Sequence, residues 1–311
     1  MKQIRIIAPA DSWKPEKEEF YQIAVSRLQV AGYQVTFAPH VKSVAYLGTA
    51  SSSERAKDFN EAFSDASVDI IIALHGGFSS NDILPHVDWD IVKNNPKPLV
   101  GYSDITVLCN AIFAKTGMKT YLGPNLSTLG LADLWEYTFD SLFEAINHNR
   151  PYLLKPSKSY IDDKQVYKTE PWLTVQDGTG EGILLGGNIQ TLFLLQGTEF
   201  QSSFDEHFIL AIEDDSLSKE YTLHGFARNI ESILQLPNVR QNIRGILIGR
   251  FEKSSKVTNE SLTKLLVSKD LLGIPIVANL DFGHTTPMAT LPIGGTVKIE
   301  ANSEIISVNF M

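Results

Sequence analysis

The sequence predicts an α/β protein with an N-terminal parallel sheet and flanking helices, a linker, and a smaller, strand-rich C-terminal α/β domain. Three observations support this fold. Short apolar runs alternate with helical stretches over roughly the first 150 residues, which is typical of a parallel sheet covered by helices. The composition then becomes polar and loses its periodicity. Beyond that segment, apolar runs return.

The N-terminal part alternates between strand-like and helix-like stretches. Its strands are expected near residues 3–8, 34–38, 68–74 and 97–101. Its helices are expected near residues 16–31, 53–65 and 104–116, with a further helix near 132–147 that closes this part. Because each strand is followed by a helix, the strands are expected to run parallel, with helices on both faces of the sheet.

The next segment differs in composition. From Asn147 to Gly182 it is rich in Pro, Lys, Ser, Tyr and Asp, and it ends in a glycine-rich stretch at residues 176–182. This pattern predicts a linker or long loop. The expected domains are therefore a nucleophile domain at 1–149, a linker at 150–182 and a C-terminal domain at 183–311.

The C-terminal part begins with the apolar run Ile183-Leu184-Leu185. Its other strands are expected near residues 208–212, 244–250, 275–278 and 296–308. At 311 residues the chain is long enough to bury one large core or two smaller ones, and two are expected.

Composition excludes several classes of protein. Hydrophobic and charged residues make up 43% and 20% of the chain, and no run of about 18 apolar residues predicts a membrane span. The N-terminal apolar stretch is too short for a signal peptide, and the lone Cys109 cannot form an intrachain disulfide, so a cytoplasmic protein is expected. The net charge is −9 and the basic residues are scattered, which argues against nucleic acid as a partner. No metal-ligand spacing is present, and no metal or cofactor is expected.

The most informative motif is Gly101-Tyr102-Ser103-Asp104, where a strand runs directly into an apolar helix. A serine on such a turn presents its hydroxyl away from the sheet and leaves backbone N–H groups free, as a hydrolase nucleophile requires. Ile105 replaces the second glycine of the usual pattern. Capping of the helix by Ser103 or Asp104 is the alternative reading.

Two further segments end apolar strands with ionisable side chains. One ends in Glu213, Asp214 and Asp215, and the other leads through Gly283 to His284. A serine hydroxyl needs a base with a pKa near 7, which histidine supplies, and a carboxylate orients that histidine. Glu213 is expected to take this role, since it follows the strand directly. Spacing alone does not separate it from the two aspartates.

These residues resemble the serine LD-carboxypeptidase family, which includes carboxypeptidases of cell-wall recycling and immunity proteins of the MccF type. The matching motifs occur in family order over nearly the whole chain. They are Gly76-Gly77, Gly101-Tyr102-Ser103-Asp104, Leu185-Gly186-Gly187-Asn188, Ile212-Glu213-Asp214 and Phe282-Gly283-His284.

The resemblance implies a catalytic triad at the interface between the two domains. Ser103 would be the nucleophile, His284 the general base and then acid, and Glu213 the orienting carboxylate. The backbone N–H groups of Gly77 and Asp104 would form the oxyanion site. By the same resemblance the protein is expected to be a homodimer.

Finer details resemble the MccF type and imply the remaining contacts. The stretch at residues 76–81 implies Ser80 and Asn81 as substrate-binding residues, and the stretch at 187–192 implies Asn188. Trp172 in the linker is the candidate for stacking on a nucleotide base, with an anchoring role in the interdomain crevice as the alternative. His75 stands where carboxypeptidase members often carry an arginine, which puts recognition of a free carboxylate there in doubt.

The expected function is hydrolysis of an amide bond in a small peptide-like substrate. The preferred substrate is an aminoacyl- or peptidyl-nucleotide of the microcin C type. The alternative in the same chemistry is release of the terminal D-amino acid from murein tetrapeptides. An alternative of another class is a non-catalytic ligand-binding module on this scaffold.

Overall fold

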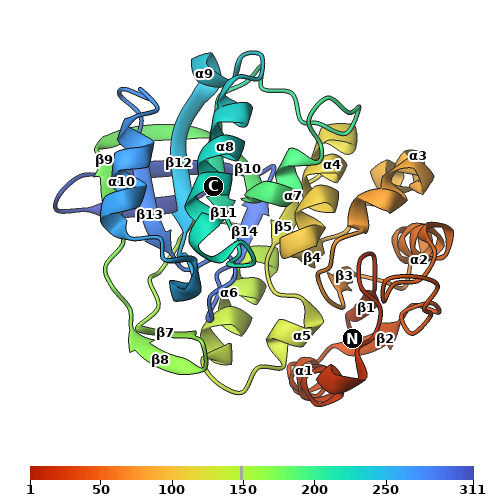
Figure 1. Cartoon of the computed structure of the whole chain (residues 1–311). Helices are drawn as coiled ribbons and strands as arrows, with labels where there is room; N and C mark the ends of the chain where they lie inside the picture. Colours follow the sequence, from red (N-terminus) through yellow and green to blue (C-terminus); the bar gives the residue numbers. More distant parts are fainter. Residues whose placement is uncertain (148–149) are drawn as a thin grey trace.

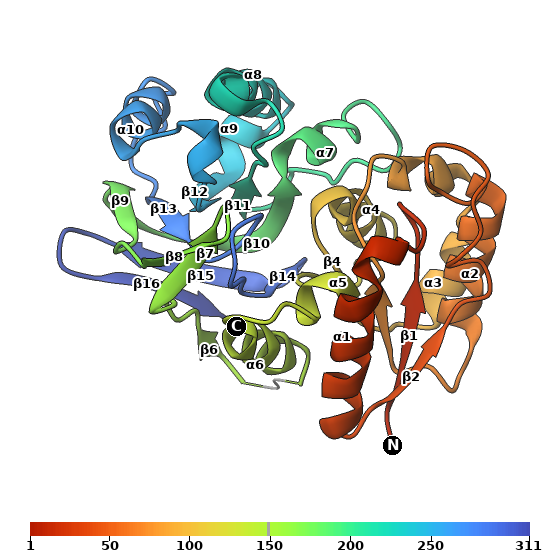
Figure 2. The same ribbon diagram turned by 60° about the horizontal axis from the view of Figure 1, so that its bottom comes forward.

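The computed structural model describes residues 1–147 and 150–311. Two large sheets lie side by side, each associated with its own helices (Figures 1 and 2). The expected α/β class, with a parallel N-terminal sheet and a second sheet domain, is confirmed. The expected domain boundary at residue 149 lies outside the described residues.

The N-terminal sheet has six strands in the order β14-β5-β4-β3-β1-β2. The five strands from the N-terminal part run parallel: β1 (Gln3–Ile7), β2 (Gln34–Phe37), β3 (Ile70–Ala73), β4 (Leu99–Gly101) and β5 (Thr120–Leu122). Strand β3 is buried along its whole length, because helices cover both faces of the sheet. The strands expected from the apolar runs are therefore confirmed, with bounds that shift by a few residues.

Helices cover the two faces of this sheet. On one face, α1 (Glu18–Val30) contacts α5 (Leu126–Leu129). On the other face, α3 (Trp89–Asn94) contacts both α2 (Ser52–Ser64) and α4 (Thr106–Thr116) (Figure 2). Helix α6 (Trp135–Asn147) follows α5. Local signals fix the start of α2, where Ser51 and Glu54 form a capping box. Short 3₁₀ turns are η1 (Pro15–Lys17), η2 (Ser80–His86) and η3 (Ser103–Ile105).

The second sheet has eight strands in the order β6-β16-β15-β10-β11-β12-β13-β9. Its four central strands are parallel: β10 (Gly178–Asn188), β11 (Phe208–Glu213), β12 (Ile243–Gly249) and β13 (Ile276–Leu280). Antiparallel strands flank them: β6 (Tyr152–Leu153), β9 (Leu173–Gln176), β15 (Thr296–Ala301) and β16 (Ile306–Phe310). The accompanying helical elements are α7 (Ile189–Phe193), η4 (Lys219–Tyr221), α8 (Thr222–Leu234), α9 (Val239–Asn242), η5 (Lys253–Ser255) and α10 (Asn259–Val267).

The prediction of a linker or long loop at residues 150–182 is wrong, because the segment contains regular strands. It contains β6, β9, the start of β10 and the hairpin of β7 (Ser159–Asp162) and β8 (Gln165–Lys168). Asp163 and Lys164 have φ values of 47° and 61°, the left-handed conformations that a two-residue hairpin turn needs. The sequence did not predict these strands, because edge strands and hairpins bury little side-chain surface and so carry no apolar pattern.

One other expectation in the C-terminal part needs correction, and one strand there was not expected. The run at 296–308 is a hairpin, because the Asn302 side chain accepts hydrogen bonds from the N–H groups of Glu304 and Ile305 and turns the chain between β15 and β16. Strand β14 (Leu291–Ile293) leaves its own part of the chain and pairs antiparallel with β5. Residues 183–311 therefore do not form one self-contained sheet.

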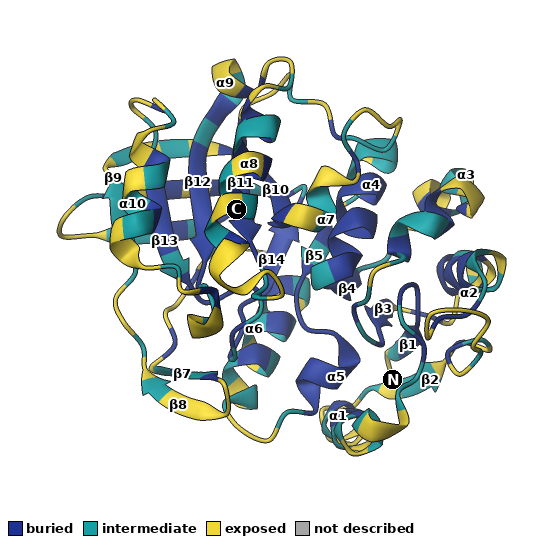
Figure 3. Ribbon diagram, in the orientation of Figure 1, coloured by how far each residue is buried: buried dark blue, intermediate teal, exposed yellow. Residues whose placement is uncertain are grey.

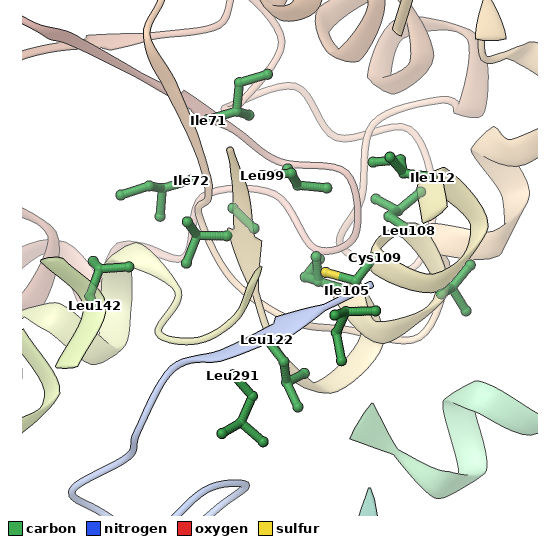
Figure 4. Close-up of a cluster of buried hydrophobic side chains, with 14 of the residues drawn as sticks. Ile71, Ile72, Leu99, Ile105, Leu108, Cys109, Ile112, Leu122, Leu142 and Leu291 are labelled. Carbon is green, nitrogen blue, oxygen red and sulfur yellow. The ribbon is translucent and has the colours of Figure 1, made fainter. Parts of the chain in front are cut away.

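The buried side chains form two clusters, and one of them spans both sheets. It joins Ile71 and Leu99 of the N-terminal sheet to Ile209 and Leu247 of the second sheet. Figure 4 shows part of this core, with Leu291 beside Leu122, and Figure 3 shows how burial follows the sheets and the inner faces of the helices. The second cluster lies under α8 and α10. The expectation of two cores is therefore met only in part, because one of the two clusters is shared by both sheets. No helix in the described ranges is long and apolar enough to cross a membrane.

Candidate active site

A cleft of about 640 Å³ opens where the two sheets meet. The loops that follow β3, β4, β10, β11 and β13 line it. Binding sites in α/β proteins occur at the carboxyl ends of parallel strands, where the loops are free to carry functional side chains. Both parallel sheets therefore supply loops to one site.

Ser103 lies at the turn between β4 and α4 with a φ of 62°. A left-handed conformation is uncommon for a residue with a side chain, and such strain is concentrated at functional turns. The neighbouring strand loop comes very close: a Cβ on Gly76 would lie 3.1 Å from Ser103 Cβ and 3.2 Å from Ser103 Oγ. Glycine at position 76 thus keeps the space around the hydroxyl open.

His284 connects Ser103 to Glu213. Its Nε2 lies 3.1 Å from Ser103 Oγ, and its Nδ1 lies 2.6 Å from Glu213 Oε2. Glu213 ends β11 and is 1% exposed, so its carboxylate acts in a site with little water. Of the three neighbouring acids, Glu213 alone is hydrogen-bonded to the imidazole. Asp214 bonds to Gln190, and Asp215 bonds to the Leu217 N–H.

The glycine before His284 makes this contact possible. Gly283 has a φ of 102°, and a Cβ there would lie 2.7 Å from Glu213 Oε2 and 2.9 Å from Glu213 Cβ. Both the backbone conformation and the close approach therefore require glycine. The ring of Tyr102 packs against the imidazole with a centroid separation of 5.3 Å.

The electrostatics of the site favour a strongly basic imidazole. Burial disfavours the charged form of His284, but the negative charge of Glu213 and the hydrogen bond to it outweigh burial and raise the pKa of His284 to about 9. Because Glu213 accepts from Nδ1–H, the Nε2 lone pair of the neutral ring faces the serine hydroxyl. This arrangement can remove the hydroxyl proton.

Backbone donors lie beside the serine. Gly77 and Asp104 both line the cleft, and neither N–H has an acceptor among the described residues. The Asp104 carboxylate accepts from the N–H groups of Ser79 and Ser80 at 2.9 and 2.8 Å. These bonds fix the loop after β3 to the turn that carries Ser103. The two free N–H groups can therefore stabilise a developing oxyanion.

The other expected substrate contacts divide into two groups. Asn188 lines the cleft, and its buried Nδ2 has no hydrogen-bond partner among the described residues. Its Oδ1 is used to cap α7. Ser80 is fully buried and its hydroxyl donates to the Asp104 carbonyl, which is incompatible with direct contact to a substrate. Asn81 is half-buried and lies outside the cleft lining.

Trp172 also lies outside the cleft lining. Its indole N–H donates to Asp281 Oδ2 at 3.2 Å. Asp281 is fully buried, is ion-paired with Arg250 at 2.9 Å, and accepts from the backbone N–H and the hydroxyl of Ser157. These contacts favour the anchoring role of Trp172, because they fasten the former linker segment to the strand end that leads to His284.

Sequence reasoning missed several charged residues of the cleft. Lys14 and Lys17 approach it from the segment after β1, and Glu252 approaches it from the second sheet, where Asp215, already a candidate from the sequence, also lines the cleft. Behind them Asp214 is buried, and burial together with the charges of Asp215 and Glu213 raises its pKa to about 7. Among the described residues, no group of three or more His, Cys, Asp or Glu side chains is arranged to hold a metal ion.

Known proteins are similar to this chain over most of its length. A family model described as the LD-carboxypeptidase N-terminal domain matches residues 4–123, and one described as the LD-carboxypeptidase C-terminal domain matches residues 181–299. YocD of Bacillus subtilis (strain 168), named as a candidate carboxypeptidase, is 40% identical over 310 residues, which cover 97% of this chain and 94% of YocD.

Solved structures are similar to this chain over its whole length. An MccF-like protein from Bacillus anthracis is 38% identical, with a TM-score of 0.96 over 100% of this chain and 96% of that one. MccF in complex with aspartyl sulfamoyl adenosine is 26% identical, with a TM-score of 0.89 over the same shares of the two chains. Two more distant relatives are the microcin C7 self-immunity protein MccF of Escherichia coli, at 29% identity over 94% of this chain and 90% of that one, and the murein tetrapeptide carboxypeptidase of Pseudomonas aeruginosa, at 25% over 96% and 94%.

Proposed function

The chain belongs to the LD-carboxypeptidase family, and we propose that it is a serine hydrolase that cleaves an amide bond with a Ser103–His284–Glu213 triad. The observation that carries this proposal is the continuous hydrogen-bonded path from Glu213 Oε2 through His284 to Ser103 Oγ. A binding module without catalysis would have no need for a buried carboxylate behind the imidazole or for the strained turn at Ser103. The non-catalytic alternative therefore has less support.

In the proposed reaction, Ser103 Oγ attacks the scissile carbonyl carbon while its proton passes to His284 Nε2. The N–H groups of Gly77 and Asp104 hydrogen-bond the oxyanion of the tetrahedral intermediate. His284 then gives the proton to the departing nitrogen, which leaves an ester on Ser103. A water molecule, deprotonated by His284, hydrolyses this ester. Glu213 keeps the imidazole in the required tautomer and stabilises the imidazolium formed in both halves of the reaction.

For the substrate, we propose an aminoacyl- or peptidyl-nucleotide of the kind bound by MccF. Similarity to a solved MccF-like protein at 38% identity supports this choice, as does similarity to MccF bound to aspartyl sulfamoyl adenosine. The second candidate is a murein tetrapeptide, supported by the name of the Pseudomonas aeruginosa relative. Asn188 Nδ2, a side-chain donor of the cleft with no partner among the described residues, would bind an acceptor of either substrate.

The test uses the two substrates in parallel. The protein is incubated with an aminoacyl sulfamoyl adenosine and, separately, with a tetrapeptide muropeptide, and the products are identified by mass spectrometry. We expect the free amino acid and sulfamoyl adenosine from the first substrate, and no product from the Ser103→Ala variant. Efficient release of D-alanine, with no cleavage of the nucleotide compound, would replace the first candidate by the second.

Trp172 offers a second discrimination between the candidates. If the indole stacks on a nucleobase after a rearrangement, Trp172→Ala raises KM for the nucleotide substrate with a smaller effect on kcat. If it acts only as an anchor through Asp281, the same change lowers the stability of the fold and does not affect KM for one substrate more than for the other.

We further propose that the protein is a cytoplasmic homodimer, on the basis of the family resemblance. Light scattering after size-exclusion chromatography tests the dimer.

A further inference from the structure

Lys17 is a half-buried cation in the catalytic cleft without a counter-ion. It follows β1 in the 3₁₀ turn η1 and lines the cleft. Across the described ranges, no carboxylate lies within ion-pair distance of its ammonium group. Asp11, an acid that also lines the cleft, is already paired with Lys14 at 2.8 Å. A charge that is partly removed from water favours a partner of opposite sign.

The side-chain partner of Lys17 is His75, whose Nε2 lies 3.1 Å from Lys17 Nζ. The other ring nitrogen of His75 lies 3.1 Å from Ser127 Oγ. Burial and the charges of Lys17 and Lys14 lower the pKa of His75 to about 3, so the ring is neutral at physiological pH. With Nδ1–H donating to Ser127, Nε2 accepts one proton of the ammonium group. His75 therefore orients Lys17 without neutralising it.

The position of this pair relates it to the reaction. His75 directly precedes Gly76, whose backbone packs against Ser103, and Gly77, which lines the cleft. The ammonium group of Lys17 therefore lies on the side of the cleft that carries the proposed oxyanion donors. A substrate whose carbonyl occupies that position brings its neighbouring groups within reach of Lys17.

We propose that Lys17 is the specificity-determining residue of the cleft and binds an anionic group of the substrate, with His75 as its positioning residue. This inference rests on the proposed function, since it assigns a role within the same site. Two chemical sources of the anion fit: the terminal carboxylate of a peptide, and the ionised acyl sulfamate or phosphoramidate that links an amino acid to a nucleotide. The histidine at position 75 thus does not remove anion recognition, because a lysine from another segment supplies the charge.

The test measures binding on the Ser103→Ala background, so that substrates stay intact and the result does not depend on turnover. Each source of the anion is represented by a matched pair of ligands. One pair is a tetrapeptide with a free C-terminal carboxylate and the same peptide as its C-terminal amide. The other is an aminoacyl sulfamoyl adenosine and the neutral aminoacyl amide of 5′-amino-5′-deoxyadenosine. Isothermal titration calorimetry gives Kd for all four.

We expect the anionic member of one pair to bind at least about tenfold more tightly than its neutral counterpart, as a charge-assisted hydrogen bond at a half-buried site provides. Lys17→Met, which keeps the chain length and removes the charge, should abolish this preference without weakening the neutral ligand. Lys17→Arg should restore part of it. His75→Leu should reduce it, because the ammonium loses its acceptor. The pair that responds identifies the source of the anion.

Lys57→Met is the matched control. Lys57 lies on α2 with 64% of its side chain exposed, so its loss changes the net charge by the same amount far from the cleft. Thermal unfolding verifies that every variant is folded. Equal binding of charged and neutral ligands by the Ser103→Ala protein, or a preference that survives Lys17→Met, would overturn the assignment. Absence of hydrolysis by the unmodified protein would instead count against the proposed function.

Discussion

Replacement of Glu213 by glutamine isolates the electrostatic part of the proposed mechanism. Glu213 Oε2 accepts from His284 Nδ1, whereas Oε1 is buried and has no partner in the part of the chain that the structure describes. An amide at this position can still accept from Nδ1–H through its oxygen, so the tautomer of His284 is preserved. The amide nitrogen then occupies the unpartnered position. The main change is loss of the negative charge behind the imidazole.

The size of the effect follows from the separation of the charges. Centres about 4 Å apart at an effective dielectric constant near 20 interact by about 4 kcal/mol. Imidazolium forms in the transition state and loses this stabilisation in the variant. Because each 1.36 kcal/mol changes the rate about tenfold, kcat should fall roughly 10³-fold. The buried amide N–H₂ costs roughly a further 1–3 kcal/mol of folding stability.

The pH profile supplies a readout that misfolding would not produce. Only the neutral imidazole accepts the serine proton, so kcat/KM is lost as the pH falls through the pKa of His284. In the unmodified protein this pKa is raised to about 9, which places the acidic limb above the ordinary imidazole range. Removal of the Glu213 charge should move the limb to lower pH.

Product formation measured by mass spectrometry between pH 5 and 10 gives both quantities. Asp215→Asn is the comparison variant, because Asp215 also raises the pKa of His284 but makes no hydrogen bond to it. Its limb should move less than that of Glu213→Gln. An unchanged rate and an unchanged limb in Glu213→Gln would refute the assignment of Glu213 as the orienting acid.

Three further substitutions test other parts of the site. Ser103→Ala should fold normally and lose roughly 10⁴-fold or more in kcat, measured by product formation, and an unchanged rate would end the triad hypothesis. Gly283→Ala should lower kcat and destabilise the fold by about 1–3 kcal/mol, because the new Cβ forces Glu213 away from His284 and the φ of 102° is unfavourable for alanine. A crystal structure of this variant with the 2.6 Å contact between His284 Nδ1 and Glu213 Oε2 intact would contradict the expectation. Asp281→Asn should lower the free energy of unfolding, measured by urea titration, by about 3–5 kcal/mol, because it leaves the buried Arg250 without its counter-charge. A loss below about 1 kcal/mol would refute the stabilising role of this ion pair.

Local patterns sufficed for the N-terminal sheet and for the residues around Ser103. Buried parallel strands such as β3 are uninterrupted apolar runs, and Gly101-Tyr102-Ser103-Asp104 combines a strand end, a turn and a helix start in adjacent residues. Each of these signals lies within a few residues of the feature it predicts. Glu213 and His284 were candidates for the same reason, because Glu213 ends one apolar strand and His284 follows another.

Features that depend on contacts between distant segments were not predictable. The pairing of β14 with β5 joins residues that are far apart in the chain, and nothing in Leu291-Pro292-Ile293 distinguishes a partner in one sheet from a partner in the other. Lys17 becomes part of the cleft only because the segment after β1 folds beside His75. A lysine in a polar stretch carries no sequence signal of such a position.

The crossing of β14 also explains how the site keeps its geometry. His284 lies between β13, which belongs to the second sheet, and β14, which belongs to the first. The loop that carries the imidazole is thus fixed at one end by the sheet of Glu213 and at the other by the sheet of Ser103. Because the core cluster that includes Leu122 and Leu291 packs continuously between the sheets, a shift of one sheet against the other would have to disrupt buried contacts. The distances of 2.6 and 3.1 Å at the imidazole are therefore set by the packing of the whole molecule rather than by the loop alone.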